Sequence, residues 1–70
     1  MTFKSGDIVK DKDSKKLLLI LEETQRQNDA YICLVLYYDD RYDNYQTYIG
    51  KRYIFYNVRP DYYDIMNRDQ

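Results

Sequence analysis

The apolar run Ala30–Leu36 constrains the fold of this chain more than any other stretch. It is short and rich in β-branched and aromatic residues, which is typical of a buried strand rather than a helix. Side chains alternate between the two faces of a strand, and here both alternating sets are apolar. We therefore expect Ala30–Tyr38 to be the central strand of a small sheet.

Further short apolar segments follow the same pattern and are separated by polar turns. The predicted strands are Ile8–Val9, Leu17–Leu21, Tyr45–Ile49 and Tyr53–Val58, and the polar loops are 11–16, 25–29 and 39–44. Pro60–Met66 is compatible with one helical turn, because proline is favoured at the first helical position. These segments predict a single all-β domain over residues 1–70, a small barrel of four or five antiparallel strands with a short C-terminal helical turn.

The core should be formed by alternate apolar residues of these strands. The predicted core residues are Val9, Leu17, Leu19, Leu21, Ile32, Leu34, Leu36, Ile49, Ile54 and Phe55. The choice between Ile54 and Phe55 stays open, because a shift of one residue exchanges the two faces of a strand.

Composition excludes several classes of protein. The chain has 70 residues, one cysteine, Cys33, and no histidine, so it can form no internal disulfide and has no zinc-binding pattern. It has no group that titrates near neutrality by default and no glycine-rich phosphate loop. We therefore expect no metal, no cofactor and no enzymatic activity.

We expect no targeting signal. Met1–Lys10 contains no apolar region of the kind found in signal peptides, and Leu17–Leu21 is far shorter than the ~20 apolar residues that span a bilayer. A lone thiol is typical of a reducing compartment. The sequence predicts a cytoplasmic protein with no membrane partner.

Tyrosine and aspartate gather in the middle of the chain. There are ten tyrosines, and residues 29–48 carry one arginine against four aspartates. Tyrosine offers a rigid aromatic surface with a hydroxyl, and nearby carboxylates can pair with basic groups of a partner. We interpret this surface as a binding site for a protein with a basic surface. The predicted partner-binding residues are Tyr37, Tyr38, Asp39, Asp40, Tyr42, Asp43, Tyr45, Tyr62 and Tyr63.

Other interpretations remain open. The tyrosine-rich segment can be a solvated hairpin tip, or a tyrosine-rich edge strand can drive self-association into a homo-oligomer. A basic surface for nucleic acid is a further alternative. Its residues would be Lys10, Lys12, Lys15, Lys16, Lys51 and Arg52, although Asp7, Asp11 and Asp13 lie among the lysines and offset their charge.

The beginning of the chain resembles the opening of small SH3-like barrels of bacteria and phages. Those barrels begin with an aromatic residue, then Gly-Asp, then valine two positions on, and Phe3, Gly6, Asp7 and Val9 match this pattern. The resemblance implies an SH3-like fold, which in different proteins binds proteins, peptides, RNA or DNA. The composition is also similar to that of small phage-encoded inhibitors, including anti-CRISPR and other anti-defence proteins, some of which mimic nucleic acid with carboxylates. That similarity implies an inhibitor of a host nucleic-acid-handling or defence protein.

Overall fold

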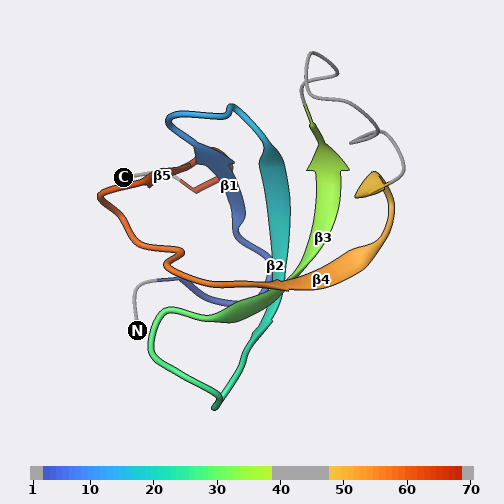
Figure 1. Cartoon of the computed structure of the whole chain (residues 1–70). Helices are drawn as coiled ribbons and strands as arrows, with labels where there is room; N and C mark the ends of the chain where they lie inside the picture. The colour runs from blue at the N-terminus through green and yellow to red at the C-terminus, as the bar shows by residue number, and fades with distance from the viewer. Residues whose placement is uncertain (1–2, 39–47, 69–70) are drawn as a thin grey trace.

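The computed structural model describes residues 3–38 and 48–68, which form one antiparallel sheet of five strands without an α-helix (Figure 1). The strands are β1 (Ile8–Asp11), β2 (Leu17–Glu23), β3 (Tyr31–Tyr37), β4 (Arg52–Phe55) and β5 (Tyr63–Ile65). Their order in the sheet is β4-β3-β2-β1-β5. The first four strands are therefore neighbours in chain order, and β5 returns to pair with β1. The all-β prediction is confirmed.

The sheet is curved because two irregularities interrupt the pairing of β2 with β3. Register shifts occur between Leu17 and Leu18 and between Ile20 and Glu22. An extra residue in one strand bends that strand and increases its twist. The curved sheet wraps around its inner face (Figure 1), while β4 and β5 remain at opposite ends of the strand order. The sheet is therefore open and does not close into the predicted barrel.

The core lies on the inner face of this sheet. It consists of Phe3, Val9, Leu18, Ile20, Tyr31, Cys33, Val35, Val58 and Tyr63, with Tyr38, Phe55 and Ile65 packed against it. The buried Asp7 accepts a hydrogen bond from the backbone N–H of Lys4 at 3.0 Å. Its carboxylate also pairs with Arg68 at 3.1 Å, so the one buried charge among the described residues has a counter-ion.

Most of the predicted core residues do not lie on the inner face of the sheet, where the core is. The prediction is correct for Val9 and, in part, for Phe55, which packs against the core. In contrast, Leu17, Leu19, Leu21, Ile32, Leu34 and Ile54 are only partly buried, and Leu36 and Ile49 are exposed. The buried residues of β2 and β3 are the alternate set. Because both faces of these strands are apolar, the alternation of side chains along a strand does not show which face turns inward.

Three predicted elements differ from the structure. The strand expected over Tyr45–Ile49 lies partly outside the described residues, and Tyr48 and Ile49 belong to a turn. Strand β4 ends at Phe55, three residues before the predicted Val58. The helical turn expected over Pro60–Met66 is limited to a tight turn, in which the Arg59 carbonyl accepts hydrogen bonds from the N–H groups of Tyr62 and Tyr63, both at 2.9 Å. The chain then pairs with β1 as β5.

The thiol of Cys33 should be unreactive in the folded protein. Cys33 is fully buried on β3, and burial raises the pKa of its thiol to about 12. Because only the thiolate attacks disulfide reagents, we expect no reaction with Ellman's reagent in native buffer at mildly alkaline pH. One thiol per chain should react after denaturation. Rapid labelling of the native protein would contradict this placement of Cys33.

Candidate functional site

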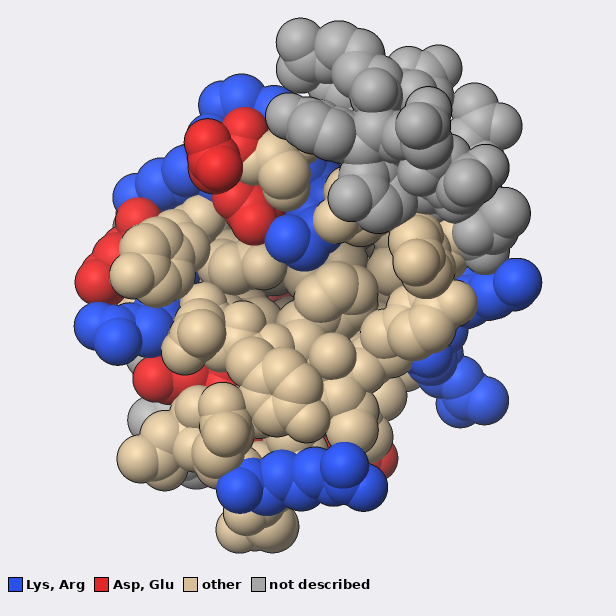
Figure 2. Space-filling view, in the orientation of Figure 1, with Lys and Arg blue, Asp and Glu red and all other residues tan. Residues whose placement is uncertain are grey.

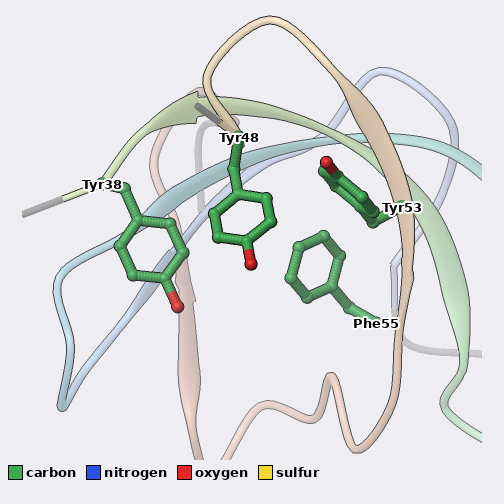
Figure 3. Close-up of a pocket in the computed structure, with 4 residues that line it drawn as sticks. All are labelled: Tyr38, Tyr48, Tyr53 and Phe55. Carbon is green, nitrogen blue, oxygen red and sulfur yellow. The ribbon is translucent and has the colours of Figure 1, made fainter. Parts of the chain in front are cut away.

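Four aromatic side chains surround a hollow at the end of the sheet near β4. Tyr38, Tyr48, Tyr53 and Phe55 line this pocket, whose volume is about 260 Å³ (Figure 3). The ring centroids of Tyr38 and Tyr48 lie 6.3 Å apart, those of Tyr48 and Tyr53 lie 5.2 Å apart, and those of Tyr53 and Phe55 lie 6.5 Å apart. The last two pairs meet edge to face, which is a favoured geometry for aromatic rings. We call this hollow the aromatic pocket.

Local backbone geometry explains how these rings meet. Tyr53 and Phe55 are two residues apart on β4, so both side chains point to the same face of the strand. Tyr48 is held beside β3 and β4 by a turn in which the Lys51 N–H donates to the Tyr48 carbonyl at 3.1 Å. Gly50 adopts a φ of 82° in this turn and donates its N–H to the Val35 carbonyl at 2.8 Å. The turn thereby anchors the pocket wall to the central strand.

A second hollow is lined by residues of the loop between β1 and β2 and of the segment from Tyr56 to Tyr63. Its volume is about 330 Å³. Its walls combine carboxylate, amide and phenol groups, and the lining residues are Asp11, Asp13, Lys16, Tyr56, Asn57, Tyr62 and Tyr63. The Arg59 guanidinium lies over the Tyr62 ring at 5.9 Å from its centroid, which supports that exposed ring from one side. We call this hollow the polar pocket.

Lys16 stands between the two pockets. Its ammonium lies 5.9 Å from the ring centroid of Tyr38 and 5.7 Å from that of Phe55, both of which line the aromatic pocket. It also lies 5.4 Å from the ring centroid of Tyr63, which lines the polar pocket. Each of these distances is within the range of a cation–π contact. A single charged side chain therefore positions aromatic rings of both pockets.

The ammonium of Lys16 is neutralised by Asp11. The two groups form an ion pair at 2.8 Å, with 11% of the Lys16 side chain and 15% of the Asp11 side chain exposed. Burial alone would lower the pKa of Lys16, but its interactions with Asp11 and Tyr63 outweigh burial and raise that pKa. Burial would raise the pKa of Asp11, but hydrogen bonds from Lys16 and from the backbone of Asp13 and Ser14 lower it. Both groups are thus held in their charged forms.

The structure separates the predicted partner-binding residues into different environments. Tyr37 is exposed at the end of β3, Tyr38 lines the aromatic pocket, and Tyr62 is exposed at the polar pocket. Tyr63 is only 6% exposed and belongs to the core, because β5 places it opposite Asp11 of β1 with its side chain on the inner face. The remaining predicted residues, Asp39, Asp40, Tyr42, Asp43 and Tyr45, lie outside the described residues.

The basic residues of the nucleic-acid alternative do not form one surface. Lys16 is directed inward, as described above, and the Lys12 ammonium lies 3.7 Å from the Asp64 carboxylate. The Lys15 ammonium donates to the carbonyl of Lys12 at 2.8 Å. Lys10 lies opposite Asp64 in the backbone pairing of β1 with β5, whereas Lys51 and Arg52 lie at the β4 edge, beyond β2 and β3 in the sheet.

Several residues of the site were missed by sequence reasoning. Tyr48, Tyr53, Phe55 and Tyr56 line the two pockets but were not predicted to bind a partner. The alternation of Tyr53 and Phe55 on one strand was a usable signal, since it places two aromatic rings on one face. Figure 2 shows uncharged surface across the middle of this view, over β4 and the segment that leads to β5, with charged side chains around it.

Neither a family model, nor a curated protein, nor a solved structure matches this chain. Residues 3–38 and 48–68 include no helix that is long and apolar enough to cross a membrane. Within these same ranges, no three His, Cys, Asp or Glu side chains are grouped so that they can hold a metal ion.

Proposed function

We propose that this chain is a non-enzymatic protein-binding domain that holds an extended, basic segment of a partner protein. The observation that carries this proposal is the pair of neighbouring pockets, one aromatic and one polar, with Lys16 between them. A ligand pocket typically combines apolar and aromatic walls with a few polar groups that fix orientation. Two such hollows side by side fit two side chains of one extended segment.

The chemistry of each pocket favours a different side chain. The rings of the aromatic pocket fit a proline, an aromatic ring or the planar guanidinium of an arginine, which stacks on aromatic faces. The polar pocket offers the exposed Asp13 and the amide of Asn57, which suit a basic side chain. In addition, Asp39 and Asp40 directly follow Tyr38 in the sequence. This distribution of acid supports a partner with a basic surface.

We also propose an SH3-like arrangement for the fold. Strands β1 to β4 are neighbours in chain order, and the tight turn at Pro60 precedes a β5 that pairs with β1. The match of Phe3, Gly6, Asp7 and Val9 to the opening of such domains agrees with this assignment. SH3 domains bind extended proline-rich segments in grooves lined by aromatic residues, which supports an extended ligand here. An inhibitory role against a nucleic-acid-handling or defence protein stays a prediction from composition.

Nucleic acid is the less favoured ligand. Single-strand binding needs a continuous positive groove along which bases can stack on aromatic rings. Lys12 and Lys16 each lie beside an aspartate, and the chain as a whole has a formal net charge of −1. Among the described basic residues, Lys12 and Lys16 therefore contribute little free positive charge that would attract phosphates.

Binding of labelled peptides tests the proposal. The probes are peptides of about ten residues that combine arginine with proline or tyrosine, and matched peptides with glutamate in place of arginine. We expect fluorescence anisotropy to show binding of the arginine peptides alone. The substitution Tyr53→Ala should weaken that binding by about 10-fold or more, because it removes one wall of the aromatic pocket.

The variant Tyr37→Ala provides the matched control. Tyr37 is an exposed tyrosine like Tyr53, but it lines neither pocket, so its loss should leave the affinity unchanged. Circular dichroism should show that both variants keep the native fold. The proposal fails if no arginine peptide binds, or if a single-stranded oligonucleotide binds instead with an affinity that falls steeply with salt.

A further inference from the structure

The middle of the outer face of the sheet carries aliphatic side chains. Ile8, Leu19 and Leu34 lie directly opposite one another across β1, β2 and β3, and this row ends at Arg52 on β4. Directly paired residues of an antiparallel sheet point to the same face, and the inward-facing partners are Val9, Leu18 and Val35. The row therefore crosses the face opposite the core.

A second aliphatic row extends this surface along the strands. Ile32 of β3 lies opposite Ile54 of β4, and Leu17 and Leu21 lie along β2. The aliphatic residues of both rows are only partly buried. We call this surface the outer aliphatic face, and its residues are Ile8, Leu17, Leu19, Leu21, Ile32, Leu34 and Ile54.

This composition is unusual for a sheet face in contact with water. An antiparallel sheet with one solvated face normally alternates apolar and polar residues along each strand. Here β2 reads Leu-Leu-Leu-Ile-Leu before its first glutamate, so neither face of that strand is polar over five positions. Contiguous exposed apolar patches on small proteins usually mark a surface that another molecule covers. The sequence is thus that of a sheet covered on both faces.

We propose that a second copy of this chain covers the outer aliphatic face, so that two sheets pack face to face in a symmetric homodimer. Charges on the same face carry both signs: Arg52 and Lys10 are basic, whereas Glu22 and Asp64 are acidic. A face with both signs can pair its charges with those of an identical face, which is the requirement of a two-fold interface. A formal net charge of −1 adds little repulsion between copies.

The chemistry of the face also favours a copy over other occupants. A membrane surface or a nucleic acid would call for a predominantly basic rim, which this face does not have. Aliphatic side chains without polar groups pack against a like surface in aligned sheets, as in the core of a β-sandwich. The dimer leaves the aromatic and polar pockets accessible, because these are lined from the inner face and the loops.

Light scattering of the purified chain tests this proposal. The wild-type protein should show twice the chain mass of 8.7 kDa and should dissociate on dilution. The double variant Leu19→Lys/Leu34→Lys places two charges at the centre of the face and should weaken self-association by at least about 100-fold, because buried unpaired charges are costly. Both side chains lie on the outer face and are partly exposed in the monomer, so a lysine ammonium at either position can reach solvent and circular dichroism should show an unchanged fold.

The variant Tyr62→Lys is the control for the double variant, because it also adds a positive charge and removes apolar surface but does so away from the outer aliphatic face. Tyr62 is 52% exposed at the polar pocket, so this variant should dimerise like the wild type. A wild-type protein that stays monomeric over about a hundred-fold range of concentration would overturn the proposal. A dimer that persists in the double variant would also overturn it and would indicate another interface, such as edge-strand pairing. Peptide binding by the monomeric variant is expected to persist, so the dimer and the binding function are tested separately.

Discussion

Replacing Leu18 by alanine should lower the free energy of unfolding by about 3 kcal/mol, because the substitution leaves a cavity in a closely packed core. Leu18 is fully buried on β2, where it lies opposite Val9 on one side and Val35 on the other. A domain of this size typically has only about 5 kcal/mol of stability, so the variant should keep about 2 kcal/mol and should unfold at a markedly lower temperature and urea concentration than the wild type. Urea denaturation followed by circular dichroism measures the effect.

The adjacent substitution Leu19→Ala is the matched control. It removes the same atoms from the neighbouring residue, but Leu19 points to the outer aliphatic face and is partly exposed. At concentrations low enough for the monomer, it should cost clearly less than Leu18→Ala, about 1–2 kcal/mol, because Leu19 keeps part of its surface exposed and its truncation leaves no closed cavity. Equal effects of the two substitutions would contradict the difference in burial between Leu18 and Leu19, and a larger effect at Leu19 would mean that the inner and outer faces are exchanged.

Replacing Lys16 by methionine should lower the free energy of unfolding by about 2–3 kcal/mol. Methionine keeps an apolar stem of similar length but removes the ammonium, which leaves the Asp11 carboxylate unpaired in a largely buried position. It also removes the cation–π contacts to three rings. Thermal unfolding and urea denaturation at neutral pH measure the loss.

Two comparisons show whether the pair itself is responsible. Lys12→Met removes an ammonium from an exposed ion pair with Asp64 in the same loop region and should cost about 0–1 kcal/mol. Acid provides the second comparison. The pKa of Asp11 is lowered in the folded protein, so the stabilisation is present at neutral pH and is lost as the pH falls below the ordinary value of 3.8. If the difference in the free energy of unfolding between the wild type and Lys16→Met stays constant at acidic pH, the ion pair of Lys16 with Asp11 is not its cause.

The fold class and the central strand could be predicted because they depend on local patterns. Short apolar runs separated by polar turns predicted β2 and β3 nearly to their ends. The inward-facing set of residues could not be predicted, because Leu18 and Leu19 carry the same side chain and differ only in what tertiary contacts reach them. The conformation after Pro60 also could not be predicted from local sequence patterns, because it depends on the long-range pairing of Tyr63–Ile65 with β1.

The candidate site was predicted in part. The excess of tyrosine directed attention to Tyr38 and Tyr62, which line the two pockets, and their binding of a partner stays a prediction. Tyr53 and Phe55 were assigned to a strand and not to a surface, because no local pattern shows that the end of β3 lies beside β4. The position of Lys16 could not be predicted from the sequence either. A lysine in a polar loop is normally solvated, and only the fold shows that its stem points toward three aromatic rings.

The pairing of β5 with β1 has a consequence for how the protein is made. Val9 lies opposite Ile65, and the Asn67 side chain hydrogen-bonds to both Ile8 and Gly6, so residues from the two ends of the chain complete the same part of the core. During synthesis on the ribosome, the hairpins of β1 to β4 can form as they emerge. The free edge of β1 stays unpaired until residues 63–67 leave the exit tunnel. Contacts between residues so distant in sequence form slowly, so the pairing of β5 with β1 should be a late step of folding.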